Sequence, residues 1–260
     1  MRSRSLTELA GNSDLISGIY NYCDRWCERC PLTSRCLVFA TEQVDHNGSP
    51  ETHYVQNEAF WHKLDSILLE TQALIAEWAR EAGIDLNHVP EEEVKTRKRR
   101  RQLVDTHPLA RAGKKYANAA SDWFREFDQA IKASDLCACD AAGEEPEQLE
   151  DAREVIQWYQ YQIAVKIMRG LSCRDDGWED EPEMAEFPKD SDGSAKVALI
   201  GIDRSMAAWR LLQLSLAERC ESIVPLILQL ERLRKRVEKS FPEARDFIRP
   251  GFDGMLVAAN

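Results

Sequence analysis

The chain has no run of about 18 or more apolar residues, the length that a membrane-spanning helix requires, so no membrane partner is expected. Its opening string, MRSRSLTELAGNSD, lacks the apolar core of a secretory signal. These two absences predict a cytoplasmic protein. Thiols stay reduced in that compartment, so a group of cysteines indicates metal binding rather than disulfide bonds.

Several catalytic motifs are absent as well. The chain contains no phosphate-binding loop, no glycine-rich dinucleotide motif, no G-x-S-x-G element and no zinc-protease motif. The common nucleotide-dependent enzymes and hydrolases are therefore excluded as first choices. Whether the chain is an enzyme at all stays open.

The chain has fewer basic than acidic residues, and its formal net charge is −11 at pH 7. This balance argues against a general nucleic-acid binder. One run, KTRKRRR from Lys95 to Arg101, departs from the trend. It could contact phosphates or an acidic partner, although the simpler interpretation is a solvated basic face or linker that balances the acidic residues before it.

The sequence shows no strand alternation and no repeat of fixed period. Apolar residues instead recur every three or four positions, the spacing of an amphipathic helix, and one such helix should begin after Asn57. The expected helices span about 57–83, 108–134, 149–171 and 194–240, and Pro225 should kink or divide the last one. We therefore predict an all-α fold, a bundle of four to five long helices with an N-terminal four-cysteine metal-binding arm.

The expected fold divides the chain into three regions. Residues 1–45 form the expected arm, residues 56–240 the helical bundle and residues 241–260 a C-terminal tail. The polar stretch 41–56 indicates a loop, and the acidic, proline-containing stretch 172–193 indicates a long exposed loop.

Four of the eight cysteines lie in the string YCDRWCERCPLTSRC, at Cys23, Cys27, Cys30 and Cys36. The spacing C-x3-C-x2-C-x5-C needs only short loops, so four thiolates can surround one metal centre at little cost in chain entropy. Thiolates favour iron–sulfur clusters, zinc and Cu(I). Aromatic and arginine side chains interspersed among the cysteines would shield such a centre and offset its negative charge.

The first three of these cysteines match C-x3-C-x2-C, which resembles the cluster motif of radical SAM enzymes. That family uses an α/β barrel and an aromatic residue at the position of Arg29, and the chain has neither, so its chemistry is not carried over. The step from Cys30 to Pro31 resembles ferredoxin-type segments, which implies a [4Fe–4S] cluster. Residues 22–36 are also similar to a segment of uncharacterised bacterial helical proteins, a resemblance that implies no activity.

Two kinds of metal site are therefore compatible with the four cysteines. A [4Fe–4S] cluster would suit electron transfer or redox sensing with a protein redox partner. A four-thiolate zinc would instead give a structural site on a helical interaction module. The dense spacing favours the cluster.

A second site was considered on the helices. Glu58 and His62 are one helical turn apart and could share a metal, and Glu154, Tyr161 and Asp203 could meet between two central helices that are apolar on all sides. Such a site would make the chain a ferritin-like metal-dependent oxidase, although no Glu-x-x-His pair is present. The simpler interpretation is a surface pair at position 58 and a buried ion-pair network at position 203.

Overall fold

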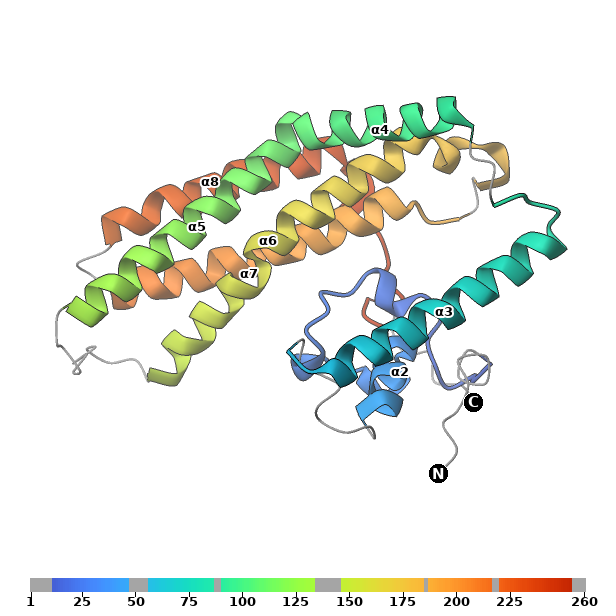
Figure 1. Ribbon diagram of the computed structural model, residues 1–260. Coiled ribbons are helices and arrows are strands. Elements are labelled where there is room, and N and C mark those ends of the chain that lie inside the picture. Colours follow the sequence, from blue (N-terminus) through green and yellow to red (C-terminus); the bar gives the residue numbers. More distant parts are fainter. Residues whose placement is uncertain are drawn as a thin grey trace, which may run out of the picture. The chain divides into compact units, whose positions relative to one another are not determined.

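The computed structural model in Figure 1 describes residues 11–46, 56–86, 90–133, 146–184, 187–216 and 220–253. Within these ranges the chain forms seven α-helices and several short 3-10 turns, and no strand. The predicted all-α class is therefore confirmed. Among the helices of these ranges, none is both long and apolar enough to cross a membrane.

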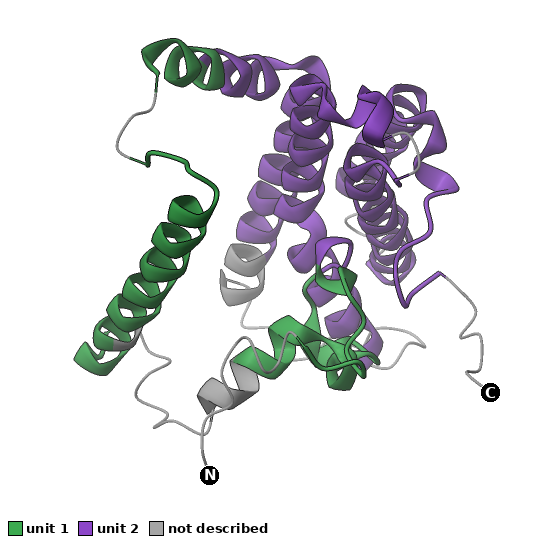
Figure 2. Ribbon diagram, turned by 90° about the vertical axis from the view of Figure 1, so that its right-hand side faces the viewer, with its two compact units in different colours: residues 1–20, 25–98 green, residues 21–24, 99–260 purple. Residues whose placement is uncertain are grey.

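The chain divides into two compact units, which Figure 2 colours separately. Unit 1 consists of residues 1–20 and 25–98, and unit 2 consists of residues 21–24 and 99–260. The short segment 21–24, which contains the first cysteine of the motif, belongs to the same unit as the helical bundle. Each unit is described by itself below.

Unit 1 contains α2 (Leu37–His46), α3 (Glu58–Glu81) and the first part of α4 (Glu91–Thr106). Helix α3 begins where the spacing predicted it, directly after Asn57, whose backbone is extended. It ends at Glu81, and Gly83 follows with a φ of 67°, which glycine adopts without steric cost. The large apolar side chains of α3 are not packed inside unit 1, since Trp61 and Trp78 are 54% and 59% exposed.

Helices α2 and α4 were not predicted. Part of α2 occupies the beginning of the stretch 41–56 that was expected to be a loop. Helix α4 covers the basic run Lys95–Arg101, which has too few apolar residues for a helical period. Glutamate, lysine, arginine and glutamine favour helices by themselves, and Glu91–Glu93 complement the positive end of the helix dipole.

Unit 2 is a bundle of four helices: α5 (Pro108–Ala133), α6 (Pro146–Asp176), α7 (Asp190–Ser215) and α8 (Cys220–Ser240). Consecutive helices run in opposite directions (Figure 1). Helices α6 and α7 pack most extensively, and α5 and α8 contact each other and complete the bundle. Gly201 of α7 permits this close approach, because a Cβ there would lie 2.9 Å from Cδ1 of Tyr159 on α6.

An aromatic cluster forms one part of the bundle core. Trp209 of α7 is fully buried, and its ring lies 5.0 Å from that of Trp123 and 5.5 Å from that of Phe124, both on α5. Its indole N–H donates to the hydroxyl of Tyr116, also on α5, at 3.0 Å. Burial raises the pKa of Tyr116 to about 12, so this hydroxyl remains a neutral hydrogen-bonding group at physiological pH.

The predicted long exposed loop 172–193 is wrong. Helix α6 continues to Asp176, 3-10 turns cover Trp178–Asp180 and Pro182–Met184, and α7 already begins at Asp190. Glu179 is only 5% exposed, because its two carboxylate oxygens accept the backbone N–H and the hydroxyl of Ser191 at 2.8 and 2.6 Å. An acidic composition suggested solvent exposure, whereas this carboxylate caps the start of α7.

The expected division of the last helical region at Pro225 is also wrong. The helices separate between Ser215 and Cys220, and Pro225 lies inside α8, in its second turn. A proline near the beginning of a helix removes a single backbone hydrogen bond, so α8 tolerates it. The C-terminal residues pack on the bundle, as Phe241 and Phe247 are 2% and 8% exposed.

His107, at the junction of α4 and α5, makes the start of α5 sensitive to pH. Its Nδ1 accepts the backbone N–H of Leu109 at 3.1 Å, which requires an unprotonated nitrogen. Burial and then the charge of Arg174 lower the pKa of His107; Arg236 acts in the same direction and Asp175 against it. The folded-state pKa therefore lies below the unfolded value, so the stabilisation is present above about pH 6.5 and is lost as pH falls through the folded pKa.

We expect protonation of His107 to remove about 1 kcal/mol of stability, the usual value of a helix cap, as pH falls from 7 to 5. The variant His107→Asn keeps an acceptor but does not titrate, so its stability should fall less over this range. Urea unfolding at several pH values measures the difference. His62→Asn is the control, because the side chain of His62 is 78% exposed. Parallel pH profiles for wild type and His107→Asn would contradict the prediction.

Candidate metal-binding segment

Three of the four cysteines begin or end a short turn in unit 1. Cys27 begins the 3-10 turn Cys27–Arg29, and the N–H of Cys30 closes it by donating to the carbonyl of Cys27 at 3.2 Å. Cys36 closes the next turn in the same way, through the carbonyl of Thr33, and directly precedes α2. All three thiols are reduced and partly exposed, so they are accessible to a metal ion.

The sulfur of Cys30 already has a hydrogen-bond donor. The backbone N–H of Leu32 lies 3.4 Å from this Sγ, on the far side of Pro31. Backbone N–H groups that point at a thiolate stabilise its negative charge and tune metal–sulfur centres. This local contact is the feature of the segment that most resembles a metal–thiolate site.

Arginine side chains hold the rest of the segment in place within unit 1. Arg35 donates from Nε to the carbonyl of Asp14 at 3.2 Å, and its own carbonyl accepts the N–H of Ile16 at 2.9 Å. The guanidinium of Arg29 lies over the Trp26 ring, 3.9 Å from its centroid. Arg25 has a φ of 58°, an uncommon conformation for a residue other than glycine, which turns the chain between Cys23 and Cys27.

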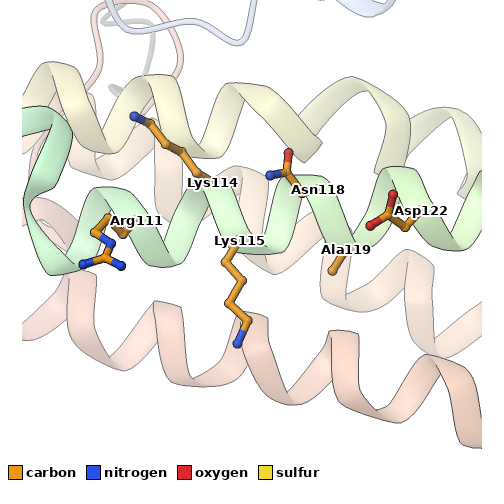
Figure 3. Close-up of a pocket in the computed structure, with 6 residues that line it drawn as sticks. All are labelled: Arg111, Lys114, Lys115, Asn118, Ala119 and Asp122. Atoms are coloured by element: carbon orange, nitrogen blue, oxygen red, sulfur yellow. The ribbon is translucent and has the colours of Figure 1, made fainter.

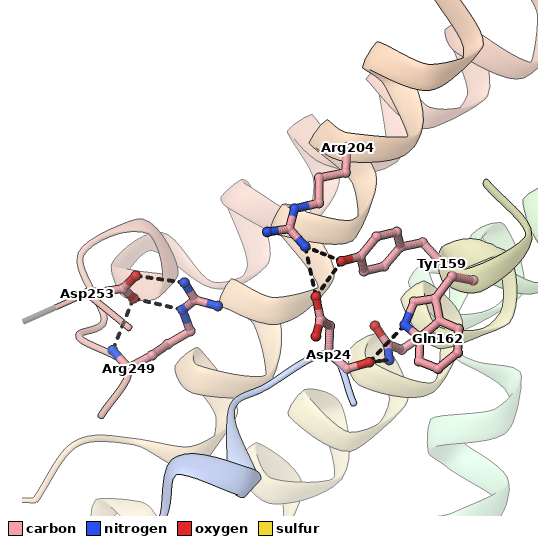
Figure 4. Close-up of polar contacts among 7 residues, drawn as sticks. Asp24, Tyr159, Gln162, Arg204, Arg249 and Asp253 are labelled. Carbon is pink, nitrogen blue, oxygen red and sulfur yellow. Dashed lines mark hydrogen bonds and ion pairs between the residues drawn. The ribbon is translucent and has the colours of Figure 1, made fainter. Parts of the chain in front are cut away.

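Cys23 belongs to unit 2 and lies between two residues that are firmly held there. The carboxylate of Asp24 accepts hydrogen bonds from Tyr159 and Arg204 at 2.5 and 2.8 Å (Figure 4). Its backbone carbonyl accepts from Trp158 Nε1 and Gln162 Nε2 at 2.9 and 2.5 Å. We call these five residues the Asp24 network.

Tyr22 is held as closely on the other side of Cys23. Its hydroxyl donates to Asp190, and its ring lies 4.7 Å from that of Phe247. Only glycine fits at position 193 beside it, because a Cβ there would come within 2.4 Å of the Tyr22 ring. The backbone on both sides of Cys23 is therefore fixed on the bundle.

The Asp24 network is suited to positioning rather than to acid–base chemistry. Burial, followed by the hydrogen bond to the Asp24 carboxylate, raises the pKa of Tyr159 well above its usual value. Tyr159 therefore stays protonated at physiological pH and acts as a donor. The carboxylate and the backbone carbonyl of Asp24 both accept hydrogen bonds from other residues of the network, so these oxygens already have partners within the protein.

The structure does not gather the cysteines into a finished ligand set. Among the described residues, no three side chains of histidine, cysteine, aspartate or glutamate are grouped so that they could hold a metal ion. The donor chemistry fits a thiolate-bound metal, but the separate turns do not converge on one point. Metal binding would therefore have to reorganise the segment, as expected where metal binding and local folding are coupled.

The proposed helical pair lies on the surface of unit 1. Nε2 of His62 is 3.5 Å from Oε1 of Glu58, one turn apart on α3, and the two side chains are 78% and 90% exposed. Exposed pairs of this spacing contribute a few tenths of a kcal/mol to helix stability. Two ligands on one exposed turn supply too few donors for the oxidase site considered from the sequence.

The three remaining residues of that set lie in unit 2 and bind different neighbours. Tyr161 is 55% exposed and shares a 2.7 Å hydrogen bond with Ser121, and Glu154 is exposed. Asp203 lies 2.7 Å from Arg245 and 3.5 Å from Arg234. These three residues therefore have separate partners, because α6 turns part of its surface to solvent.

Sequence reasoning missed Asp24, although it directly follows the first cysteine. Its partners lie 135 and 180 residues away along the chain, and no local sequence pattern indicates a contact over such a separation. The sequence predicted an ion-pair network at position 203 without identifying its partners. In the structure Arg204 binds Asp24, and Asp203 binds the arginines after α7.

A second surface feature lies on α5. Arg111, Lys114, Lys115, Asn118, Ala119 and Asp122 line an open groove of about 480 Å³, which we call the α5 groove (Figure 3). The close-up shows Arg111 and Lys115 extending to one side of the helix and Lys114 to the other.

Comparison with known proteins assigns no family. No family model matches the chain, and neither a curated protein nor a solved structure matches it significantly. The resemblance of residues 22–36 to a segment of bacterial helical proteins stays a prediction.

Proposed function

We propose that this is a metal-binding helical protein whose Cys23, Cys27, Cys30 and Cys36 hold a [4Fe–4S] cluster for electron transfer or redox sensing. The observation that carries the proposal is the hydrogen bond from the N–H of Leu32 to Sγ of Cys30. It occurs where two cysteines are separated by two residues, and a third cysteine ends the next turn. The dense spacing of the four thiols adds to this support.

The fixed backbone around Cys23 fits the same role. An electron-transfer centre works best when its ligands change position little between oxidation states, and tight positioning of supporting residues serves that end. Tyr22 and Asp24 provide it for the first ligand of the motif. Four thiols that bind a metal require a reducing compartment such as the cytoplasm.

A structural zinc is the second candidate. The turn from Cys27 to Cys30, with an N–H directed at the second sulfur, also suits a zinc–thiolate site. Zinc bound by four thiolates in small domains contributes roughly 10–16 kcal/mol of apparent binding energy to folding. In that case the segment would be a metal-dependent scaffold for a protein partner.

The test is metal analysis with a visible spectrum on full-length protein purified without oxygen. We expect about four irons and acid-labile sulfide per chain and a brown colour. Cys30→Ser should lose most of this metal, because it removes a ligand. Cys173→Ser is the matched control, since Cys173 is a partly buried thiol on α6 outside the motif.

The outcomes separate the two candidates. One zinc per chain and no colour would replace the cluster by the structural site. Equal metal content in Cys30→Ser and Cys173→Ser, or a protein purified without oxygen that holds neither iron nor zinc, would contradict both.

A further inference from the structure

The α5 groove is an open surface along one helix that carries an excess of positive charge. Arg111, Lys114 and Lys115 line it together with Asn118, and Asp122 is the single acid of the lining. Asp122 is already paired with Arg125 at 2.5 Å, one turn further along α5. Its charge is therefore largely offset, and the groove keeps a positive excess.

Two of the basic side chains have no acid to neutralise them. Lys114 is paired with Asp105, whereas Arg111 and Lys115 are exposed and have no acidic partner in the part of the chain that the structure describes. They are four residues apart on α5, so their Cβ atoms lie about 5–6 Å apart on one face. His107 precedes them by one further turn on the same face.

The neighbouring helices add to the positive potential. Helix α8 runs antiparallel to α5, and the charge of its Arg236 reaches His107, as does that of Arg174 from α6. Asp175 of α6 acts on His107 with the opposite sign, and the adjacent Asp176 is paired with Arg100 at 2.9 Å.

The end of α4 that belongs to unit 2 carries further arginines. Arg99 and Arg101 are exposed and have no acidic partner within the described ranges. The basic run singled out in the sequence therefore leads along the chain into the first turns of α5. A cluster of this density in a chain of net charge −11 is a local property that the overall charge conceals.

The chemistry of the groove fits phosphate groups in a row. Ala119 is the one lining residue without a polar side chain, and three of the six lining residues are cationic. From Arg111 to Asp122 the helix rises about 16 Å, at about 1.5 Å per residue. An open, elongated and positively charged surface suits an extended, hydrated polyanion.

We propose that the α5 groove binds the sugar–phosphate backbone of a nucleic acid, without reading its base sequence. Arg111, Lys115 and the arginines at the end of α4 contact successive phosphates. Contacts of this kind release condensed counterions, so the affinity falls steeply with salt. The proposal is independent of the metal at the cysteine segment, because all of these residues lie in α4 and α5.

The test is fluorescence anisotropy of a labelled single-stranded 20-nucleotide DNA with the full chain between 50 and 200 mM salt. With one phosphate contacted by each of Arg99, Arg101, Arg111 and Lys115, log K should fall with log salt at a slope of about −2.8. The double variant Arg111→Gln, Lys115→Gln should bind at least about tenfold more weakly at 50 mM salt. Its slope should shrink to about −1.4, the value for the two remaining contacts at Arg99 and Arg101.

The control variant carries the same change of charge elsewhere on unit 2. Lys189→Gln with Arg210→Gln alters exposed residues outside the groove and should leave affinity and slope unchanged. Absence of binding at 50 mM salt, or equal weakening by both double variants, would overturn the proposal. Equal competition by polyglutamate would also overturn it, in favour of an acidic protein segment as the ligand.

Discussion

Replacing Trp209 by alanine is expected to lower the free energy of unfolding of the bundle by about 3–5 kcal/mol, the usual cost of deleting a buried aromatic side chain. Trp209 is fully buried against the rings of Trp123 and Phe124. The substitution leaves a cavity and removes the hydrogen-bond partner of the buried Tyr116 hydroxyl. Urea unfolding followed by far-ultraviolet circular dichroism measures the change.

Two control variants help to explain the loss of stability in Trp209→Ala. The first separates the effect of lost side-chain volume from that of the lost hydrogen bond, and the second shows the effect of removing an exposed indole. Trp209→Phe keeps most of the apolar volume and removes the indole N–H, so it should cost clearly less than alanine. Trp61→Ala removes an indole that is 54% exposed on α3 and should change stability by no more than about 0.5 kcal/mol. A loss at Trp209 no larger than that at Trp61 would show that this cluster is not part of the stable core.

Replacing Asp24 by alanine should lower the free energy of unfolding by about 1–3 kcal/mol and release the backbone around Cys23. The change removes the acceptor of Tyr159 and the ion-pair partner of Arg204. Because Arg204 is 55% exposed, water replaces much of the lost ion pair, and the larger cost falls on the buried tyrosine. Hydrogen exchange of a peptide covering residues 21–24 should become faster while the rest of the bundle stays protected.

Two further variants, Asp24→Asn and Asp180→Ala, serve as controls for Asp24→Ala. Asparagine keeps one acceptor oxygen and should fall between wild type and alanine. Asp180 forms an ion pair with Lys189 in which both side chains are well exposed, so its loss should cost little. If Asp24→Ala and Asp180→Ala had equal effects, the Asp24 network would not hold the segment in place.

A helix could be predicted from the sequence where its apolar residues lie on one face and its polar residues on the other. Helix α5 has a pronounced apolar face, and its limits agree closely with the expected 108–134. Helix α4 has almost no such face and was overlooked, although its residue types favour a helix. Pro225 predicted a kink or a division of the last helical region, and the sequence offers no equally visible signal near residue 216.

The candidate site was predictable in its residue types and not in its geometry. Cysteine spacing indicates a thiolate site from the chain alone, since it depends on short-range closure. The Asp24 network instead depends on side chains of α6 and α7 that happen to face one short segment, and such pairing is a property of the folded bundle. Glu179 is a similar case, because its acidic surroundings pointed to solvent and its partner Ser191 lies beyond the turn.

The separation between residues 21–24 and their partners has a consequence for how the chain folds. Helices α5 to α8 follow one another along the chain, so most of their contacts close short loops and can form early. The hydrogen bonds of Asp24 to Tyr159 and Arg204 close loops of 135 and 180 residues, and they need α6 and α7 in place first. The segment around Cys23 is thus expected to reach its native position only after α6 and α7 have packed against each other.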